Sequence, residues 1–446
     1  MRKNIIQASV VAALLAASMP AAAVSYGAFD PRSLAMGGVG VASGSGGNAG
    51  FINPGLLGIN QEYDGFTLEL PMLYGRAADP DDLITAADDF NTADYVGTFS
   101  DALDQLNISV AQVQADSNVI NQPGFQTRVE DEKEAVSEAS RGLLGGLKSM
   151  SGKPIIGEAA AGFVIALPSK TVGLSFQART RLAGGGIAEY TDEDDTNLND
   201  ILNQVDAIDV ADDTTYVGIE NIADTASTTQ LTSNLQTRIA VISEVGISIA
   251  REFTVAGHDV SVGITPKYVQ INLYHFGFFG NELDQAEIEL SDGEKIYTDM
   301  NLDFGMAKDF GNGWKMGFAV NNLLSKEYET QPNSVQMASE TVSIGPQARL
   351  GVAHSNEWVT VAVDADLNAA DPIGYEAETQ YVGIGAELDI FDTLQLRLGY
   401  RSNLKDADTS VPTVGLGLSP FGLHIDIAVS GNENELSAAG QLGFRF

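Results

Sequence analysis

The amino-acid sequence predicts an all-β transmembrane barrel of about 14 antiparallel strands. Three features of the 446 residues support this prediction: an export signal at the start, strands in which apolar and polar residues alternate, and connections that alternate between short and long. An outer-membrane barrel has short turns at one end and longer loops at the other. A soluble β-sandwich has no reason to sort its loops in this way.

Residues 1–23 have the features of a cleaved secretory signal peptide. Arg2 and Lys3 form a positive start, Ile5–Ala17 is mostly apolar, and Ala21–Ala23 fits cleavage after small residues. The apolar run is too short for a transmembrane anchor, which is the alternative interpretation. We therefore expect an exported protein of the Gram-negative outer membrane.

The composition excludes several classes of function. The chain has no Cys, so disulfides, thiolate metal sites and cysteine nucleophiles are ruled out. The formal net charge is −36, and a chain this acidic repels nucleic acid. A mean hydropathy of zero together with 47 Gly suits a barrel with one apolar face and one polar face.

The stretch from Phe29 to Leu57 is rich in Gly and Ala and almost uncharged. A surface linker would be more polar than this. We therefore predict that residues 24–60 form an N-terminal plug, or hatch, inside the barrel. Its candidate contact residues are Asn48, Phe51, Asn53, Pro54 and Gly55.

Residues 61–446 are predicted to form the barrel, beginning with a strand over Tyr63–Tyr74 that places Met72 on the same side as Phe66, Leu68 and Leu70. Asp79-Pro80 then predicts a helix start, because Asp is a favoured N-cap and Pro a favoured first helical residue. We expect a helical insert over residues 80–151, in the first extracellular loop, with a break around residues 122–124. Its apolar stripes should pack on each other.

From Ile156 onward the pattern is almost entirely strand, interrupted by a predicted acidic loop at residues 190–234. Further strands are expected near Leu235, His258, Glu294, Trp314, Thr341, Trp358, Glu376, Leu394, Val411, Leu423 and Glu435. Short connections near residues 169, 256, 311, 355, 391 and 420 alternate with long ones at 75–154, 190–234, 277–293, 325–340, 368–375 and 402–409.

Charged strand residues should face the barrel lumen, because a charge on the lipid face costs about 2–4 kcal/mol near the membrane midplane. The alternation allows two interpretations of these charges: a network of structural ion pairs, or a polar passage that attracts an anionic group. The predicted lumen-facing charges are Arg179, Arg181, Glu244, Lys267, Asp303, Lys315, Arg349, Asp364, Glu387, Arg397, Arg401 and Asp426.

The last strand alternates and ends in aromatic residues. Phe444 and Phe446 are similar to the terminal signature by which bacterial outer-membrane barrels are recognised by the barrel-assembly machinery. Catalytic signals are weak by comparison, since the four His lack ligand spacing and the acidic run at Asp192 lacks the central Gly of a calcium loop. We expect no catalytic residues, no metal and no cofactor, and therefore no enzyme.

Two N-terminal stretches, Phe29–Ala42 (FDPRSLAMGGVGVA) and Phe51–Leu57 (FINPGLL), resemble the start of the FadL-like outer-membrane proteins. The branch labelled conjugal transfer protein TraF is more similar still. Later stretches support that branch: Gly263–Tyr268, Val320–Leu323, Glu378–Tyr381 and Leu396–Arg401. The FadL resemblance implies a fourteen-stranded barrel with an N-terminal hatch that passes hydrophobic compounds such as long-chain fatty acids, although the usual hatch ending is Asn-Pro-Ala. The TraF resemblance implies a role in plasmid transfer.

These observations predict a plugged channel that binds and passes small hydrophobic or amphipathic solutes. The alternative is a structural or interaction protein associated with conjugal transfer or another cell-surface assembly. The expected partners are outer-membrane lipid, the barrel-assembly machinery, a small hydrophobic solute and a surface or transfer-apparatus protein, but not nucleic acid.

Overall fold

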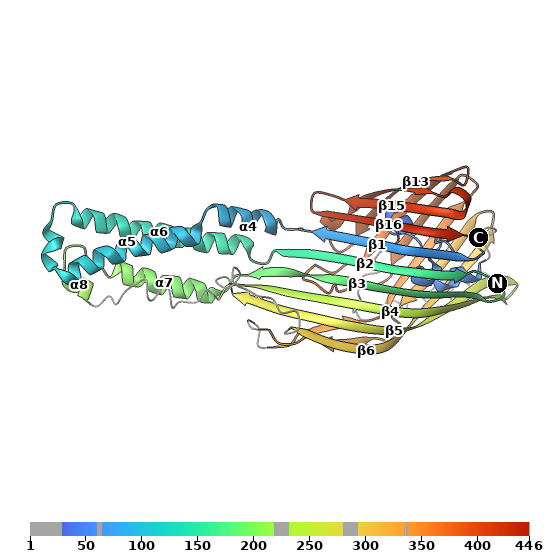
Figure 1. The fold of residues 1–446 in the computed structure, drawn as a ribbon, viewed down its shortest axis with the longest axis horizontal. Helices are drawn as coiled ribbons and strands as arrows, with labels where there is room; N and C mark the ends of the chain where they lie inside the picture. The colour runs from blue at the N-terminus through green and yellow to red at the C-terminus, as the bar shows by residue number, and fades with distance from the viewer. Residues whose placement is uncertain are drawn as a thin grey trace.

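The computed structural model describes residues 29–59, 65–217, 232–279, 293–333, 335 and 338–445. The predicted signal peptide and Phe446 lie outside this range. Fourteen antiparallel strands close into a barrel in which β1 pairs with β16, and this confirms the predicted β-barrel and its strand number (Figure 1). The barrel strands are β1 (Thr67–Ala78), β2 (Pro154–Leu167), β3 (Gly173–Glu189), β4 (Asn234–Val255), β5 (His258–Phe279), β6 (Glu294–Gly311), β7 (Trp314–Asn321), β10 (Gln347–Ser355), β11 (Val359–Asp366), β12 (Tyr381–Ile390), β13 (Leu394–Asn403), β14 (Val411–Leu418), β15 (Leu423–Gly431) and β16 (Glu435–Arg445).

The barrel wall is uneven in height. Strands β3 to β6 contain 17 to 22 residues, whereas β7 and β10 to β15 contain 8 to 10. A tilted strand needs about 9–11 residues to cross a membrane. The long strands therefore form a collar that continues beyond the membrane-spanning height, on the side from which the helices project (Figure 1).

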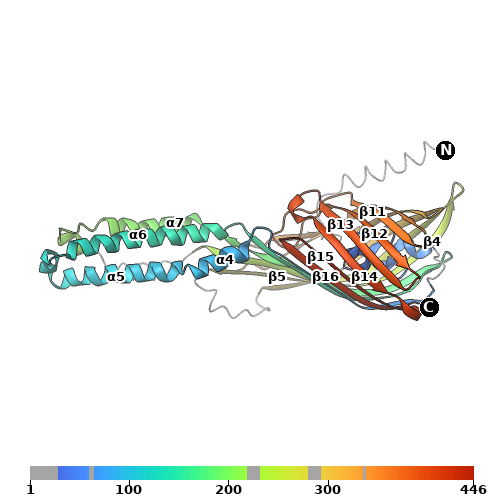
Figure 2. The same ribbon diagram turned by 90° about the horizontal axis from the view of Figure 1, so that it is seen from above.

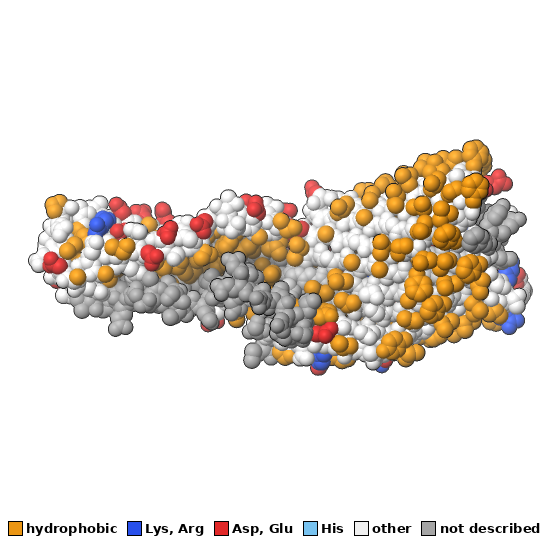
Figure 3. Space-filling model, viewed as in Figure 1, with side chains coloured by type: hydrophobic (Ala, Val, Ile, Leu, Met, Phe, Trp, Pro, Cys, Tyr) orange, Lys and Arg blue, Asp and Glu red, His pale blue; other side chains and the backbone are white. Residues whose placement is uncertain are grey.

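The outer face of the barrel is apolar. Along β14, buried and exposed residues alternate strictly, and the exposed ones include Val414, Leu416 and Leu418. Hydrophobic side chains gather at the end of the barrel away from the helices (Figure 3). The exposed aromatic residues near the short turns are Phe310, Trp314, Trp358, Phe391 and Phe421. An apolar band with aromatic residues at its edge is typical of a surface that faces lipid.

A helical extension projects from one end of the barrel (Figures 1 and 2). Its elements between β1 and β2 are α4 (Leu83–Thr92), α5 (Tyr95–Ala115), the 3₁₀ turn η2 (Ser117–Asn121) and α6 (Phe125–Met150). Gly124 caps α6 with a φ of 83°, a conformation that favours glycine. Leu106, Val129 and Val136 are fully or almost fully buried where α5 and α6 pack on each other. No helix among the described residues is both long and apolar enough to span a membrane.

The stretch predicted as an acidic loop is partly helical, with α7 (Asp192–Asp206) and α8 (Thr214–Val217). Leu198, Ile201 and Val205 recur at helical spacing and complete the core of the extension. The acidic run at Asp192 forms the first turn of α7, where negative charge is favourable beside the positive end of the helix dipole. The prediction of a loop throughout was therefore wrong at this point.

A second difference concerns the strand expected near Thr341. Strand β9 (Thr341–Ile344) lies outside the barrel wall and pairs with β8 (Lys326–Glu329), and the wall resumes at β10. The β8–β9 hairpin buries Tyr328, Val342 and Ile344 against inward-facing residues of β4 and β5. The core at the barrel mouth is therefore apolar. Two short 3₁₀ turns, η3 (Ala407–Thr409) and η4 (Pro420–Gly422), connect strands later in the barrel.

The first strand also differs from its expected phase. The register of β1 against both neighbours shifts between Glu69 and Met72. As a result Met72 is buried at 1 % exposure, whereas Leu73 is 51 % exposed. Such a bulge moves every later residue to the other face. The prediction that Leu68 and Met72 lie on the same face of the strand was therefore wrong. Beyond the bulge, Arg76 faces the lumen.

Candidate functional site: the barrel lumen and its N-terminal segment

The N-terminal segment, residues 29–59, lies inside the barrel and is almost entirely buried. It consists of α2 (Pro31–Ala35), α3 (Ala49–Ile52) and the 3₁₀ turn η1 (Pro54–Gly58), joined by glycine-rich turns. The Asp30 side chain caps α2 by accepting from Ser33 N, and Pro31 occupies the first helical position. Leu57 O accepts from Ser169 N, which places the end of the segment at the β2–β3 turn.

Charged side chains of the wall hold the backbone of this segment. Gly40 N and Val41 N both donate to Oδ2 of Asp364 on β11, at 2.7 and 2.8 Å. Two successive backbone N–H groups form a concavity that suits a carboxylate. Arg349 on β10 donates from Nη1 to Gly38 O at 3.1 Å. Charged residues of the wall thus hold the glycine-rich part of the segment through its own peptide groups.

Asn53 anchors the far end of the segment. Its Nδ2 donates to Val41 O at 2.7 Å and to Met306 O on β6 at 3.0 Å, and its Oδ1 accepts from Gly55 N. Pro54 and Gly55 lie against Gly263 and Gly305 of the wall, where an added Cβ would come within 3 Å of the segment. The other predicted contact residues, Asn48 and Phe51, contact Asp30 and Phe29 respectively.

Glycines in the wall allow the segment to lie directly against the strands. A Cβ at Gly385 would lie 2.2 Å from Met36 O, and a Cβ at Gly399 would lie 2.3 Å from Gly37 N. A Cβ at Gly383 would lie 2.2 Å from Gly37 O. In sequence these residues are ordinary inward positions of alternating strands, so the contact could not be recognised until the segment was placed.

Most of the predicted lumen charges are buried and joined in pairs. Arg397 contacts both Glu387 and Asp426, at 2.6 and 2.5 Å, and Arg32 of the segment shares Glu387 at 2.8 Å. Lys315 is half-buried on β7. The pairing favours the interpretation of these charges as structural. Further ion pairs of the predicted set include Arg349–Asp366, Arg401–Glu435, Lys267–Glu244, Lys267–Asp303 and Arg179–Glu244.

Sequence reasoning missed a second charged cluster around Arg76. This guanidinium contacts Glu158 at 2.9 Å, Glu376 at 2.5 Å and Glu435 at 2.7 Å. Its side chain is 3 % exposed. The bulge in β1 turned Arg76 inward, and no sequence signal marked that bulge beyond Pro71 within the strand.

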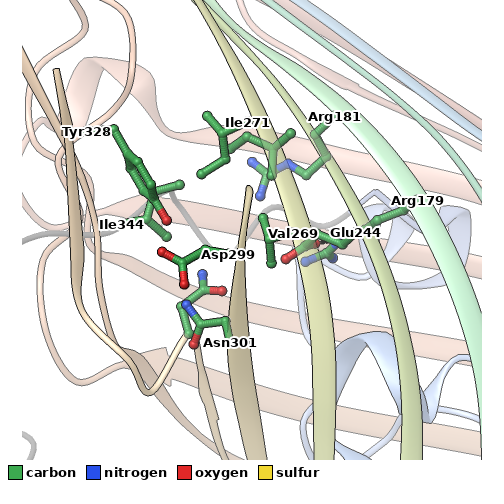
Figure 4. Close-up of a pocket in the computed structure, with 11 residues that line it drawn as sticks. Arg179, Arg181, Glu244, Val269, Ile271, Asp299, Asn301, Tyr328 and Ile344 are labelled. Atoms are coloured by element: carbon green, nitrogen blue, oxygen red, sulfur yellow. Dashed lines mark hydrogen bonds and ion pairs between the residues drawn. The ribbon is translucent and has the colours of Figure 1, made fainter. Parts of the chain in front are cut away.

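Two hollows remain in the lumen beside the long strands. The upper hollow is lined by both apolar and charged side chains, and Figure 4 shows Tyr328 and Ile344 facing Arg181 and Glu244 across it. The lower hollow is bounded by Phe51 of the segment. The remaining lining of the upper hollow is Arg179, Ile242, Val269, Ile271, Asp299, Asn301 and Asn322. Among the described residues, no group of three or more His, Asp or Glu is placed to hold a metal ion.

The fold and the lumen together define a closed fourteen-stranded barrel that holds its own N-terminal segment. The chain belongs to the family described as F plasmid transfer operon, TraF, protein, whose model matches residues 50–366. This confirms the resemblance seen in the sequence. No curated protein matches the chain.

Solved structures with a similar arrangement are hydrocarbon channels and a FadL homologue. The toluene transporter TbuX of Ralstonia pickettii is 13 % identical with a TM-score of 0.47, covering 94 % of this chain and 98 % of that one. The monoaromatic hydrocarbon channel CymD is 11 % identical with a TM-score of 0.48, covering 95 % and 99 %. A Pseudomonas aeruginosa FadL homologue is 10 % identical with a TM-score of 0.42, covering 94 % and 98 %.

Proposed function

We propose that this protein is an outer-membrane channel for small hydrophobic or amphipathic solutes, in which the N-terminal segment is the plug. The observation that supports this most directly is the upper hollow at the mouth, which lies above a lower hollow bounded by the segment. Pockets that bind small molecules combine apolar lining with polar groups that fix orientation, and this hollow has five apolar and six polar lining residues. The paired charges beneath it favour a lumen stabilised by ion pairs over an open anion channel. No enzymatic step is proposed.

The proposed orientation follows from the two ends of the barrel. Short turns lie at one end, and the helices and longer loops lie at the other. Outer-membrane barrels place short turns in the periplasm and long loops outside. The helical extension and the upper hollow then face the exterior, and the N-terminal segment is reached from the periplasm after a signal peptide is removed.

A second function is favoured by the helical extension. Residues 79–153 hold 14 acidic and 5 basic residues, and residues 190–217 hold 9 acidic and none basic. The extension has a hydrophobic core of its own, to which α5, α6 and α7 all contribute. A self-contained acidic bundle that projects from the cell suits contact with a surface or transfer-apparatus protein, in keeping with the family description.

Uptake of a fluorescent fatty acid and of a neutral aromatic dye, in cells lacking and regaining the gene, tests the channel. Ile271→Asn places an amide in the upper hollow, and we expect it to reduce uptake by more than half. Thr298→Asn changes an exposed residue on the outside of β6 and serves as the control. Equal uptake with and without the gene would exclude the transport function.

The same cells separate the second function from the first. Reversing the exposed charges of Asp101, Asp104 and Glu134 leaves the buried core of the extension intact. If the extension binds a partner, conjugation frequency should fall while dye uptake is preserved. An unchanged conjugation frequency and an unchanged partner pull-down would exclude the interaction function.

A further inference from the structure

The two hollows are stacked along one wall and share two lining residues, Arg179 and Glu244. These residues face each other directly on β3 and β4. The pair above them, Arg181 and Ile242, lines only the upper hollow. The Arg179–Glu244 pair therefore lies at the level where one hollow ends and the other begins; Figure 4 shows both side chains beside the upper hollow.

The next pair down the wall, Gln177 and Gly246, lines only the lower hollow. On the neighbouring strands the same division holds, because Val269 belongs to the upper hollow and Lys267 to the lower one. The charged pair on β3 and β4 thus separates the two hollows, and Lys267 lies just below this level on β5. A solute that entered from the mouth would meet the Arg179 guanidinium before it met the N-terminal segment.

Arg179 also joins the wall to the segment. Its guanidinium lies 4.9 Å from the ring centre of Phe29 and 5.5 Å from that of Phe51. The two rings stack edge to face at 5.2 Å. A guanidinium over an aromatic face is attracted by the ring quadrupole, and the attraction is stronger when both groups are shielded from water. The position of Arg179 is therefore coupled to the position of the plug.

Glu244 does not depend on Arg179 alone. Its Oε1 also contacts Lys267 Nζ at 2.7 Å, and Lys267 contacts Asp303 at 2.9 Å. A buried carboxylate left without any partner would be very costly. Because Lys267 stays in place, the Arg179 side chain can swing away without leaving Glu244 uncompensated.

We propose that Arg179 is the gate between the upper and lower hollows, held shut by Glu244 on the wall and by Phe29 and Phe51 on the plug. This inference rests on the proposed channel function and names the residue that controls it. Movement of Arg179 joins the two hollows into one passage that reaches Phe51. Displacement of the plug removes its aromatic contacts, so the gate and the plug open together.

Cysteine labelling tests the gate directly, because the chain has no Cys of its own. Gln177→Cys reports on the lower hollow and Ile242→Cys on the upper one, each in the full-length protein purified in detergent micelles. The rate of reaction with N-ethylmaleimide, a neutral reagent, is measured with and without Arg179→Ala. We expect Gln177→Cys to react at least tenfold faster when Arg179 is removed, and Ile242→Cys to react readily in both backgrounds.

Three further variants make the result specific. Arg179→Lys retains a cation beside Glu244, so Gln177→Cys should still react slowly in this background. Arg179→Met removes the cation and should accelerate the reaction of Gln177→Cys as Arg179→Ala does. Arg179→Met takes the place of Arg179→Ala if the alanine variant fails to fold. Arg181→Ala is the matched control two residues along β3, and should leave the rate unchanged. Folding is verified by the heat-modifiable mobility of each barrel on a gel.

An unchanged rate after loss of Arg179, or an equal increase with Arg181→Ala, would overturn the gate while leaving the channel function intact. If Ile242→Cys itself is unreactive, the upper hollow is not open to solvent, and the gate and the proposed channel function fail together.

Discussion

Single glycines decide how closely the N-terminal segment approaches the barrel wall. We expect Gly399→Ala to destabilise the folded barrel by about 1–3 kcal/mol, the usual cost of overpacking, because its Cβ would lie 2.3 Å from Gly37 N. Gly440→Ala is the matched control, since no atom lies within 4 Å of a Cβ at that position. The urea midpoint of unfolding measures the stability of both variants. Equal midpoints would contradict a close contact between the segment and the wall at Gly399.

At the residue scale, the sequence predicted which side chains point inward but not which of them meet. Strand alternation placed Arg397 and Glu387 in the lumen, because charge on the lipid face is costly. Arg32 contacts the same Glu387 although 355 positions separate them. Such a contact depends on where the N-terminal segment lies within the barrel, and that position is fixed by backbone contacts without a side-chain signature.

At the scale of elements, α7 is held to α6 by a contact at the base of the extension. Lys148 Nζ contacts Asp195 at 3.0 Å, and this hydrogen bond lowers the pKa of Asp195 below its usual 3.8. The stabilisation is therefore present above about pH 3.8 and is lost as the pH falls through the lowered pKa of the folded state.

We therefore expect the melting temperature of the helices to fall further between pH 6 and pH 3 in the wild type than in Asp195→Asn, because the variant lacks this titrating carboxyl group. Far-UV circular dichroism melts at the two pH values measure the difference. Identical losses in the two proteins would contradict a role for the contact.

The elements predicted best were those with a strong period, such as the helices over residues 80–151 and the strands from β10 onward. The errors occurred where a local signal competed with packing. The acidic run at Asp192 was typical of a solvated loop, but Leu198 and Ile201 bury against the other helices and make it helical. Strand β9 has the alternation of a barrel strand, yet it closes the mouth as part of a hairpin.

At the scale of the whole molecule, the uneven wall and the segment inside it together define the passage. Strands β3 to β6 rise above the rest and carry both hollows along their inner face. The strands pair only with one another around the full circumference, so the barrel closes without the segment. The N-terminal segment is therefore the element that we expect to close the lumen, and its removal should leave the wall intact.

Planar-bilayer conductance before and after deletion of residues 28–57 tests this central claim most directly. Loss of the segment removes Arg32 from Glu387, but Arg397 remains as the partner of that carboxylate, so the deleted barrel should still assemble. The account predicts low conductance for the intact protein and a severalfold or larger rise after deletion. An unchanged conductance in a correctly assembled barrel would contradict it.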